Sequence, residues 1–276
     1  MKSRYAICCE RELHYVEWGE GRETIIAWHG LARTGRDMDD IAAHLASRYR
    51  VVCPDTIGRG LSQWSPQPEG EYCLAFYAKL AVALLDRLAI RDCMWLGTSM
   101  GGALGISLAA GALKGRIRRL VLNDIGPELG AAAVQRIRTY AGNPPEFDRM
   151  SELEQYFRTI YRPYGWLSDE QWRRLAETSA RRTASGRLAP HYDPKIVLQF
   201  EHHPHDYDQW VAYDAVDCPT LCLRGESSDL LLPEVAQAMR HRGPRAEVVT
   251  IAGCGHAPAL NVPEQVQLVE RFLSVN

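Results

Sequence analysis

Short, mostly apolar runs alternate with longer helix-like segments along most of this chain. Each run ends at a polar or glycine-rich stretch, and the runs are residues 24–28, 50–53, 93–96, 119–123, 220–224 and 247–251. These runs indicate strands, and residues 24–28 are too continuously apolar to be half exposed, which indicates a strand buried on both faces. Strands that alternate with helices form a parallel sheet with right-handed crossovers. The pattern therefore predicts an α/β fold with a mostly parallel sheet.

The segments between and before these runs complete the pattern. Tyr5–Cys9 and Leu13–Trp18 flank a charged turn at residues 10–12, which predicts a hairpin ahead of the first buried strand. The helix-like segments are residues 37–45, 72–88, 100–113, 233–240 and 263–273. The third of these is rich in glycine and alanine, which would let that helix pack closely against the sheet.

The alternation stops between about residues 127 and 208, where helix-like segments follow one another without a buried strand. This stretch holds 11 of the 24 aromatic residues of the chain. We expect residues 127–208 to form an inserted helical cap, with residues 1–126 and 209–276 as the core domain. Some of the rings are expected to line a ligand cavity, although a small helical subdomain also needs large side chains for its own core.

Composition limits the class of protein and its partners. The chain has 276 residues, of which 46% are hydrophobic and 24% charged, as in a soluble globular protein. Its formal net charge of -2 offers no basic excess for a nucleic acid or an anionic surface. The first ten residues lack an apolar signal segment, and no run is long enough to cross a bilayer. We therefore expect a cytoplasmic protein without a nucleic-acid or membrane partner, and the sequence leaves the oligomeric state open, a homodimer included.

The spacing of cysteines and histidines does not match a metal site. The eight cysteines are scattered, mostly in apolar segments, which favours buried thiols over disulfides. Cys218 and Cys222 are not followed by a second pair at zinc-ligand spacing. His202, His203 and His205 crowd near the end of the cap, but their spacing fits neither one helical face nor a zinc pattern. We expect no metal and no cofactor.

Residues 97–101 read GTSMG, which matches the G-x-S-x-G pattern of a nucleophile elbow. In such a turn a serine sits between a strand and a helix, and small neighbours accommodate its strained backbone. Here the pattern follows a predicted strand and opens a helix-like segment, as that geometry requires. Ser99 is therefore the candidate nucleophile.

A serine nucleophile needs a histidine base and a carboxylate that orients the histidine. Of the nine histidines, His256 lies directly after the last predicted strand, in a glycine-flanked loop that can hold an imidazole over the carboxyl edge of the sheet. Two carboxylates compete for the third role. Asp229 lies a few residues beyond the penultimate strand, and Asp124 directly follows an earlier strand. Both preserve the chain order serine, acid, histidine, so the order alone does not decide between them.

The remaining requirement is an oxyanion hole, which binds the negative charge that develops on the substrate. The backbone N–H groups of Met100, at the start of a helix, and of Leu31 are the candidates. Gly30 lets the backbone approach closely before Leu31, and His29 is expected to pin this loop rather than to take part in the chemistry.

With these pieces in place, the chain resembles the α/β-hydrolase fold family, in particular bacterial esterase-like members with a helical cap. The resemblance runs over nearly the whole length and rests on the segments HGL at 29–31, DTIGRGLS at 55–62, GTSMGG at 97–102, LRGESSD at 223–229 and GH at 255–256. It implies a mostly parallel, doubly wound sheet. In this family the acid usually follows the strand that carries the Leu-Arg-Gly-like segment, which favours Asp229 over Asp124.

The resemblance also implies the chemistry. Dehalogenase and epoxide hydrolase branches use an aspartate where this chain has Ser99, which argues against those reactions. We expect a serine hydrolase with a catalytic triad of Ser99, Asp229 and His256, which cleaves a small or medium carboxylic ester through an acyl-enzyme. Carbon-carbon bond hydrolases, lactonases, thioesterases and cofactor-free oxygenases share this fold, as would a noncatalytic ligand receptor, and the sequence leaves these alternatives open.

Overall fold

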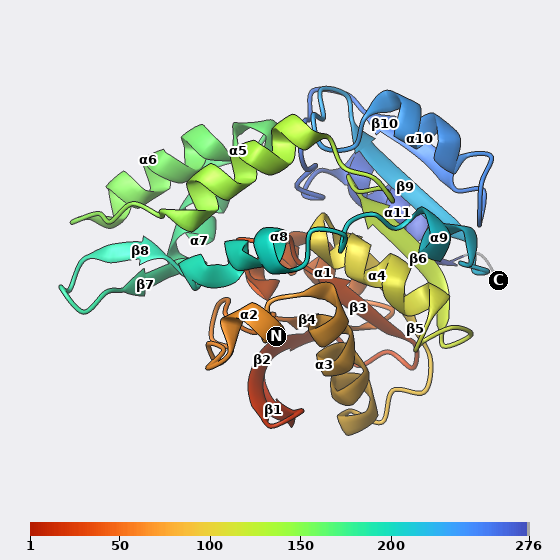
Figure 1. Ribbon diagram of the computed structural model, residues 1–276, viewed down its shortest axis with the longest axis horizontal. Helices are drawn as coiled ribbons and strands as arrows, with labels where there is room; N and C mark the ends of the chain where they lie inside the picture. The colour runs from red at the N-terminus through yellow and green to blue at the C-terminus, as the bar shows by residue number, and fades with distance from the viewer. Residues whose placement is uncertain (275–276) are drawn as a thin grey trace.

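The apolar strands form the central layer of the molecule, where both of their faces are covered. The computed structural model describes residues 1–274, and its main sheet has the strand order β1-β2-β4-β3-β5-β6-β9-β10 (Figure 1). The strands are β1 (Lys2–Cys8), β2 (Arg11–Trp18), β3 (Thr24–Trp28), β4 (Arg50–Pro54), β5 (Cys93–Thr98), β6 (Ile117–Asn123), β9 (Thr220–Gly225) and β10 (Glu247–Ile251). From β4 to β10 all neighbours are parallel, whereas β2 pairs antiparallel with both β1 and β4. The predicted α/β fold with a mostly parallel sheet is confirmed.

The N-terminal hairpin has a tighter turn than the sequence suggests. β1 and β2 pair from Lys2 with Glu17 to Cys8 with Arg11, so only Cys9 and Glu10 lie in the turn. Both turn residues have positive φ, at 49° and 61°. A two-residue turn of this hand matches the twist of the strands. The second strand therefore begins at Arg11, two residues before the predicted start at Leu13.

Helices cover both faces of the sheet because successive strand residues point to opposite sides. Ile26 and Trp28 pack in one core cluster with residues of α3, α4 and α10, whereas Ile25 and Ala27 pack in another with residues of α1 and α11. The sheet is thus wound on both faces, as the resemblance implied. The helices of this core are η1 (Gly35–Met38), α1 (Asp39–Leu45), α2 (Pro68–Glu71), α3 (Leu74–Arg87), α4 (Met100–Ala110), α9 (Trp210–Asp214), α10 (Pro233–Met239) and α11 (Pro263–Ser274).

Residues 127–208, here named the cap segment, lie between β6 and β9 and extend together from one side of the sheet (Figure 1). Their elements are α5 (Ala131–Gly142), α6 (Met150–Ile160), η2 (Arg162–Tyr164), α7 (Asp169–Thr178), β7 (Ala180–Arg182), β8 (Leu188–Pro190), η3 (Pro194–Leu198) and α8 (Gln199–His202). Phe157, Tyr161 and Trp172 form a small core of their own with Leu153 and Ala176. The short hairpin β7–β8, with β8 buried, was not expected from the sequence. The division into a core domain and a separate cap stays a prediction.

All eight cysteines are free, and seven of them are buried while Cys9 is exposed. The scattered thiols therefore behave as small apolar side chains, which agrees with the sequence pattern.

Within residues 1–274, no helix combines the length and the apolar character needed to span a bilayer.

Candidate active site

Ser99 occupies a sharp turn between β5 and α4. Its backbone has φ 52° and ψ -120°, a conformation that costs energy for any residue with a side chain. Space at this turn exists only because its flanking residues are glycines. A Cβ added to Gly97 would lie 2.2 Å from the carbonyl oxygen of Gly101, and one added to Gly101 would lie 2.3 Å from the carbonyl oxygen of Trp28. The turn therefore has the geometry of a nucleophile elbow.

His256 lies in the loop after β10 and reaches Ser99. Its Nε2 is 2.9 Å from Ser99 Oγ, and its side chain is 12% exposed. Hydrogen bonds from distant segments hold this loop in place. The backbone N–H of Gly255 donates to the carbonyl of Pro163 in the cap segment (2.7 Å), and the side-chain Nδ2 of Asn123 donates to the carbonyl of Pro258 (2.9 Å).

Asp124 is the carboxylate that contacts the imidazole. Its Oδ2 lies 2.7 Å from His256 Nδ1, and the residue is fully buried. Two further donors satisfy the carboxylate, namely the N–H of Gly225 (2.7 Å) and the hydroxyl of Ser228 (2.6 Å). A buried charge is tolerated when hydrogen bonds compensate it in this way. Ser99, His256 and Asp124 thus form one continuous hydrogen-bonded chain.

The prediction that Asp229 orients His256 is corrected by this geometry. Asp229 lies 47% exposed at the surface and forms a two-pronged ion pair with Arg136 of α5, at 2.7 and 2.8 Å. β6 and β9 are adjacent in the sheet, so a carboxylate from the end of either strand could approach the histidine. The turn after β9 places Ser228, rather than Asp229, against the buried carboxylate of Asp124.

The loop after β3 lies beside the nucleophile. A Cβ added to Gly30 would lie 3.5 Å from Ser99 Cβ, an ordinary van der Waals distance, which shows how closely this loop passes the nucleophile. Leu31 follows in this loop, and Met100 is the first residue of α4, where backbone N–H groups lack partners within the helix. Among residues 1–274, neither of these two N–H groups donates to a protein acceptor. The role of these two N–H groups as oxyanion donors stays a prediction.

His29 pins the loop, and its ring makes contacts only with the backbone and one hydroxyl. Nδ1 lies 2.6 Å from the carbonyl of Gly30, and Nε2 accepts the N–H of Thr56 at 2.9 Å. Complete burial lowers the pKa of His29 to about 4, because the charged form would lose its hydration. His29 is therefore neutral at physiological pH and acts as a structural link between two loops.

Arg59 is a residue that sequence reasoning missed. It is fully buried, and its guanidinium donates to the carbonyl of Leu31 (2.9 Å) and the hydroxyl of Tyr77 (2.8 Å) and approaches Met100 Sδ (3.6 Å). No carboxylate within residues 1–274 forms an ion pair with it. Arg59 thus contacts both residues that carry the candidate oxyanion donors, and its buried positive charge is met by neutral hydrogen-bond acceptors and by the faces of the Tyr72 and Tyr77 rings. The segment 55–62 was recognised as a motif, but its central arginine gave no signal of its own.

Ser99 lines a small cavity, and two further cavities share lining residues with it. A cavity of about 30 Å³ is lined by Ser99, His256 and Leu31. On the cap side it is lined by aromatic rings, including those of Tyr140 and Tyr161. Burial raises the pKa of both of these tyrosines, so they are uncharged at neutral pH. A wider entrance of about 870 Å³ lies on the side of His256.

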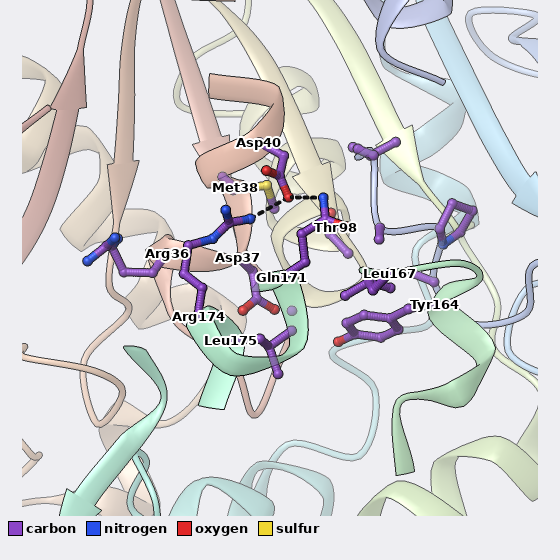
Figure 2. A pocket seen from close by; sticks show the side chains of 15 residues that line it. Arg36, Asp37, Met38, Asp40, Thr98, Tyr164, Leu167, Gln171, Arg174 and Leu175 are labelled. Carbon is purple, nitrogen blue, oxygen red and sulfur yellow. Dashed lines mark hydrogen bonds and ion pairs between the residues drawn. The ribbon is translucent and has the colours of Figure 1, made fainter. Parts of the chain in front are cut away.

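An inner cavity lies on the other side of the nucleophile, between the segment 36–40 and α7 (Figure 2). Its volume is about 40 Å³, and Gly30, Thr98 and Tyr164 line both this cavity and the one at Ser99. Asp40 accepts hydrogen bonds from Arg174 (2.6 Å) and Gln171 (3.1 Å) of α7, which close the cavity from the cap side. The inner cavity is therefore far smaller than the entrance on the side of His256.

Comparisons with known proteins agree with this geometry. A family model described as "Alpha/beta hydrolase family" matches residues 25–267. The 3-hydroxybutyrate-oligomer hydrolase of Cupriavidus necator is 37% identical over 94% of this chain and 92% of that protein. A 2-hydroxymuconate semialdehyde hydrolase of Pseudomonas putida is 28% identical over 82% of this chain and 77% of that protein.

A solved structure supports the same assignment. An alpha/beta hydrolase from Novosphingobium aromaticivorans superposes with a TM-score of 0.88 and 35% identity, over 99% of this chain and 97% of that one. The shared fold and the extent of the sequence match leave one assignment. The chain belongs to the alpha/beta hydrolase family.

Proposed function

We propose that this enzyme is a serine hydrolase that cleaves a small or medium carboxylic ester through an acyl-enzyme on Ser99. The observation that carries the proposal is the hydrogen-bonded chain from Ser99 through His256 to Asp124, with distances of 2.9 and 2.7 Å. This arrangement has the donor and acceptor order of a serine, histidine and aspartate triad. In the proposal Asp124, not Asp229, is the acid.

The proposed cycle uses the groups around Ser99 in sequence. His256 accepts the Ser99 proton as the hydroxyl attacks the ester carbonyl, and the amides of Leu31 and Met100 bind the oxyanion. His256 then donates the proton to the leaving alcohol, which breaks the ester bond and leaves the acyl group on Ser99. Water activated by His256 releases the acid. Asp124 holds the imidazole in the required tautomer and stabilises its cationic form.

A short hydroxyacyl ester is the substrate class that we propose. The relative from Cupriavidus necator, which matches this chain over nearly its whole length, is named for its action on 3-hydroxybutyrate oligomers. The inner cavity of about 40 Å³ supports a short acyl group, because a long alkyl chain would not fit there. The wide entrance leaves room for a larger alcohol portion.

A fluorophosphonate probe tests the mechanism directly. Mass spectrometry of the intact protein should show one adduct, which is absent from the Ser99→Ala variant. A series of p-nitrophenyl esters from acetate to decanoate, together with the linear dimer of 3-hydroxybutyrate, should show turnover that falls as the acyl chain lengthens. Retention of full activity by folded Ser99→Ala would overturn the proposal.

Cleavage of a carbon-carbon bond beside a ketone is the second candidate. It is favoured by the similarity to the 2-hydroxymuconate semialdehyde hydrolase of Pseudomonas putida, which is 28% identical. Turnover of a β-diketone without turnover of any ester would favour this reaction. An absent adduct on folded protein would instead direct attention to histidine-base chemistry or to a noncatalytic receptor.

A further inference from the structure

The entrance cavity continues into the cavity of the nucleophile. Four residues line both spaces, namely Arg136, Tyr140, Ile160 and His256, whereas Ser99 lines only the cavity of the nucleophile. A substrate that reaches Ser99 from this side therefore passes the guanidinium of Arg136. The entrance is roomy, at about 870 Å³, so part of a bound substrate can stay in it during the reaction.

Three charged side chains line this entrance, namely Arg136, Arg162 and Asp229. Arg162 comes from η2 of the cap segment, and no carboxylate within residues 1–274 pairs with it. Arg136 pairs with Asp229, but the two side chains are 46% and 47% exposed. Exposed ion pairs of this kind contribute little stability, so a substrate group can replace Asp229 at small cost. The entrance thus carries a positive excess and one arginine whose present partner is readily exchanged.

The position of His256 decides which part of an ester would occupy the entrance. In the proposed reaction, the leaving oxygen must lie within hydrogen-bond reach of His256 Nε2 to receive its proton. His256 is also the member of the triad that lines the entrance. The alcohol portion of the ester therefore extends outward, past the two arginines, while the acyl portion points to the small inner cavity.

We propose that Arg136 and Arg162 bind a free carboxylate on the alcohol portion of the substrate, so that the preferred leaving group is a hydroxy acid. Guanidinium groups bind carboxylates through paired, charge-assisted hydrogen bonds, and the pair with Asp229 shows that Arg136 adopts this geometry. This inference rests on the proposed ester hydrolysis. It makes Asp229 an internal competitor of the substrate carboxylate rather than a member of the triad.

A matched pair of substrates isolates the contribution of the carboxylate. The linear 3-hydroxybutyrate dimer and the same dimer with its terminal carboxyl converted to a primary amide share one scissile ester. We define the selectivity as kcat/KM for the acid divided by kcat/KM for the amide. Arg136→Gln should lower this selectivity about tenfold, through KM, and Arg162→Gln should lower it severalfold.

Arg138→Gln is the matched control. Arg138 lies on the same helix, is exposed and does not line the entrance, so this variant removes the same charge from the protein at a different place. Its selectivity should stay within about twofold of wild type, because residues two apart on a helix face different sides. Equal effects of Arg136→Gln and Arg138→Gln, or a wild-type selectivity near one, would overturn the carboxylate site.

Asp229→Asn tests the competition in the opposite direction. Removal of the internal carboxylate frees Arg136, so the selectivity for the acid should rise severalfold. A fall of a hundredfold or more for both substrates would instead show that Asp229 serves the triad and would overturn the role assigned here. An unchanged selectivity would also count against the proposed competition.

Binding to an inactive variant separates failure of the carboxylate site from failure of the proposed function. Calorimetric titration of Ser99→Ala with the acid and the amide measures the same preference without turnover. One outcome is that the wild-type enzyme cleaves neither substrate, while Ser99→Ala binds the acid about tenfold more tightly than the amide and Arg136→Gln in that variant abolishes the difference. The carboxylate site then stands and ester hydrolysis fails. If esters are cleaved without any Arg136-dependent preference, ester hydrolysis stands and the site fails.

Discussion

Asp124 Oδ2 lies 2.7 Å from His256 Nδ1, although 132 positions separate the two residues in the chain. Asp124 directly follows β6 and His256 follows β10, and the single strand between β6 and β10 in the sheet is β9. The contact is possible because the carboxyl ends of parallel strands meet at one edge of the sheet. Positive φ at Asp124 (55°) turns the chain directly after the strand, and the N–H of Gly225 at the end of β9 then holds its carboxylate.

Asp124→Asn should reduce kcat for ester hydrolysis by about 10³- to 10⁴-fold, because the amide carries no charge to stabilise the imidazolium. The side chains are nearly equal in size, so the fold should persist. Steady-state kinetics, together with a thermal melt of the same preparation, provides the measurement. A loss below about tenfold would show that Asp124 is not the acid.

Arg59→Met should lower kcat about tenfold to a hundredfold with little change in KM. The variant removes a positive charge that would stabilise the oxyanion, and the oxyanion exists only during the reaction. Tyr77→Phe is the matched control, since it removes one hydrogen-bond partner of the guanidinium but leaves the charge and its bond to Leu31. Both variants should lose stability, whereas only Arg59→Met should weaken the binding of a boronic acid, which mimics the tetrahedral adduct. Equal effects of the two variants on kcat and on boronic acid binding would mean that Arg59 is purely structural.

Gly101→Ala should destabilise the protein by about 3 kcal/mol or prevent folding, because its Cβ would lie 2.3 Å from the carbonyl oxygen of Trp28. Gly70→Ala serves as the control, since a Cβ there meets nothing within 4 Å and the helix α2 tolerates alanine. That variant should be neutral or more stable by up to about 1 kcal/mol. Urea unfolding of both variants measures the difference, and equal stabilities would contradict the tight packing of the elbow.

Acid should weaken the fold through His29. The pKa of this histidine is about 4 in the folded protein, because burial opposes its charge, against an ordinary value of 6.5. The unfolded chain therefore binds a proton at a higher pH than the folded one, so this contribution is fully present above pH 6.5 and is lost as the pH falls towards 4. The loss amounts to about 3 kcal/mol.

Urea unfolding at several pH values between 7 and 4 measures this dependence. Burial also lowers the pKa of His191, which adds a loss in the same direction. Comparison with His29→Asn isolates the part due to His29, since the variant lacks the titrating ring. Its free energy of unfolding should depend less steeply on pH, and an unchanged slope would contradict the assignment.

Local patterns were sufficient for most elements of the core. The runs that predicted β3 to β6, β9 and β10 correspond to strands within a few residues. In β3, for example, every residue is buried, which requires uninterrupted apolar side chains, whereas the edge strand β10 buries only Val248. The predicted turn of the hairpin was wrong, by one residue at the end of β1 and by two at the start of β2, since positive φ at Cys9 and Glu10 leaves little trace in residues of these types. In the cap segment, β8 was missed because three residues carry too short a pattern to recognise.

The α/β fold, the elbow around Ser99 and the loop of His256 were predictable from local sequence, because each depends on residues that are neighbours in the chain. Which of Asp124 and Asp229 contacts His256 was not predictable in this way. Asp124 follows β6 and Asp229 follows β9, and these strands are adjacent and parallel. Local sequence therefore does not distinguish which carboxylate reaches the histidine. The choice follows from contacts between distant segments: Ser228 and Gly225 satisfy the buried carboxylate of Asp124, and Arg136 of the cap segment draws Asp229 to the entrance.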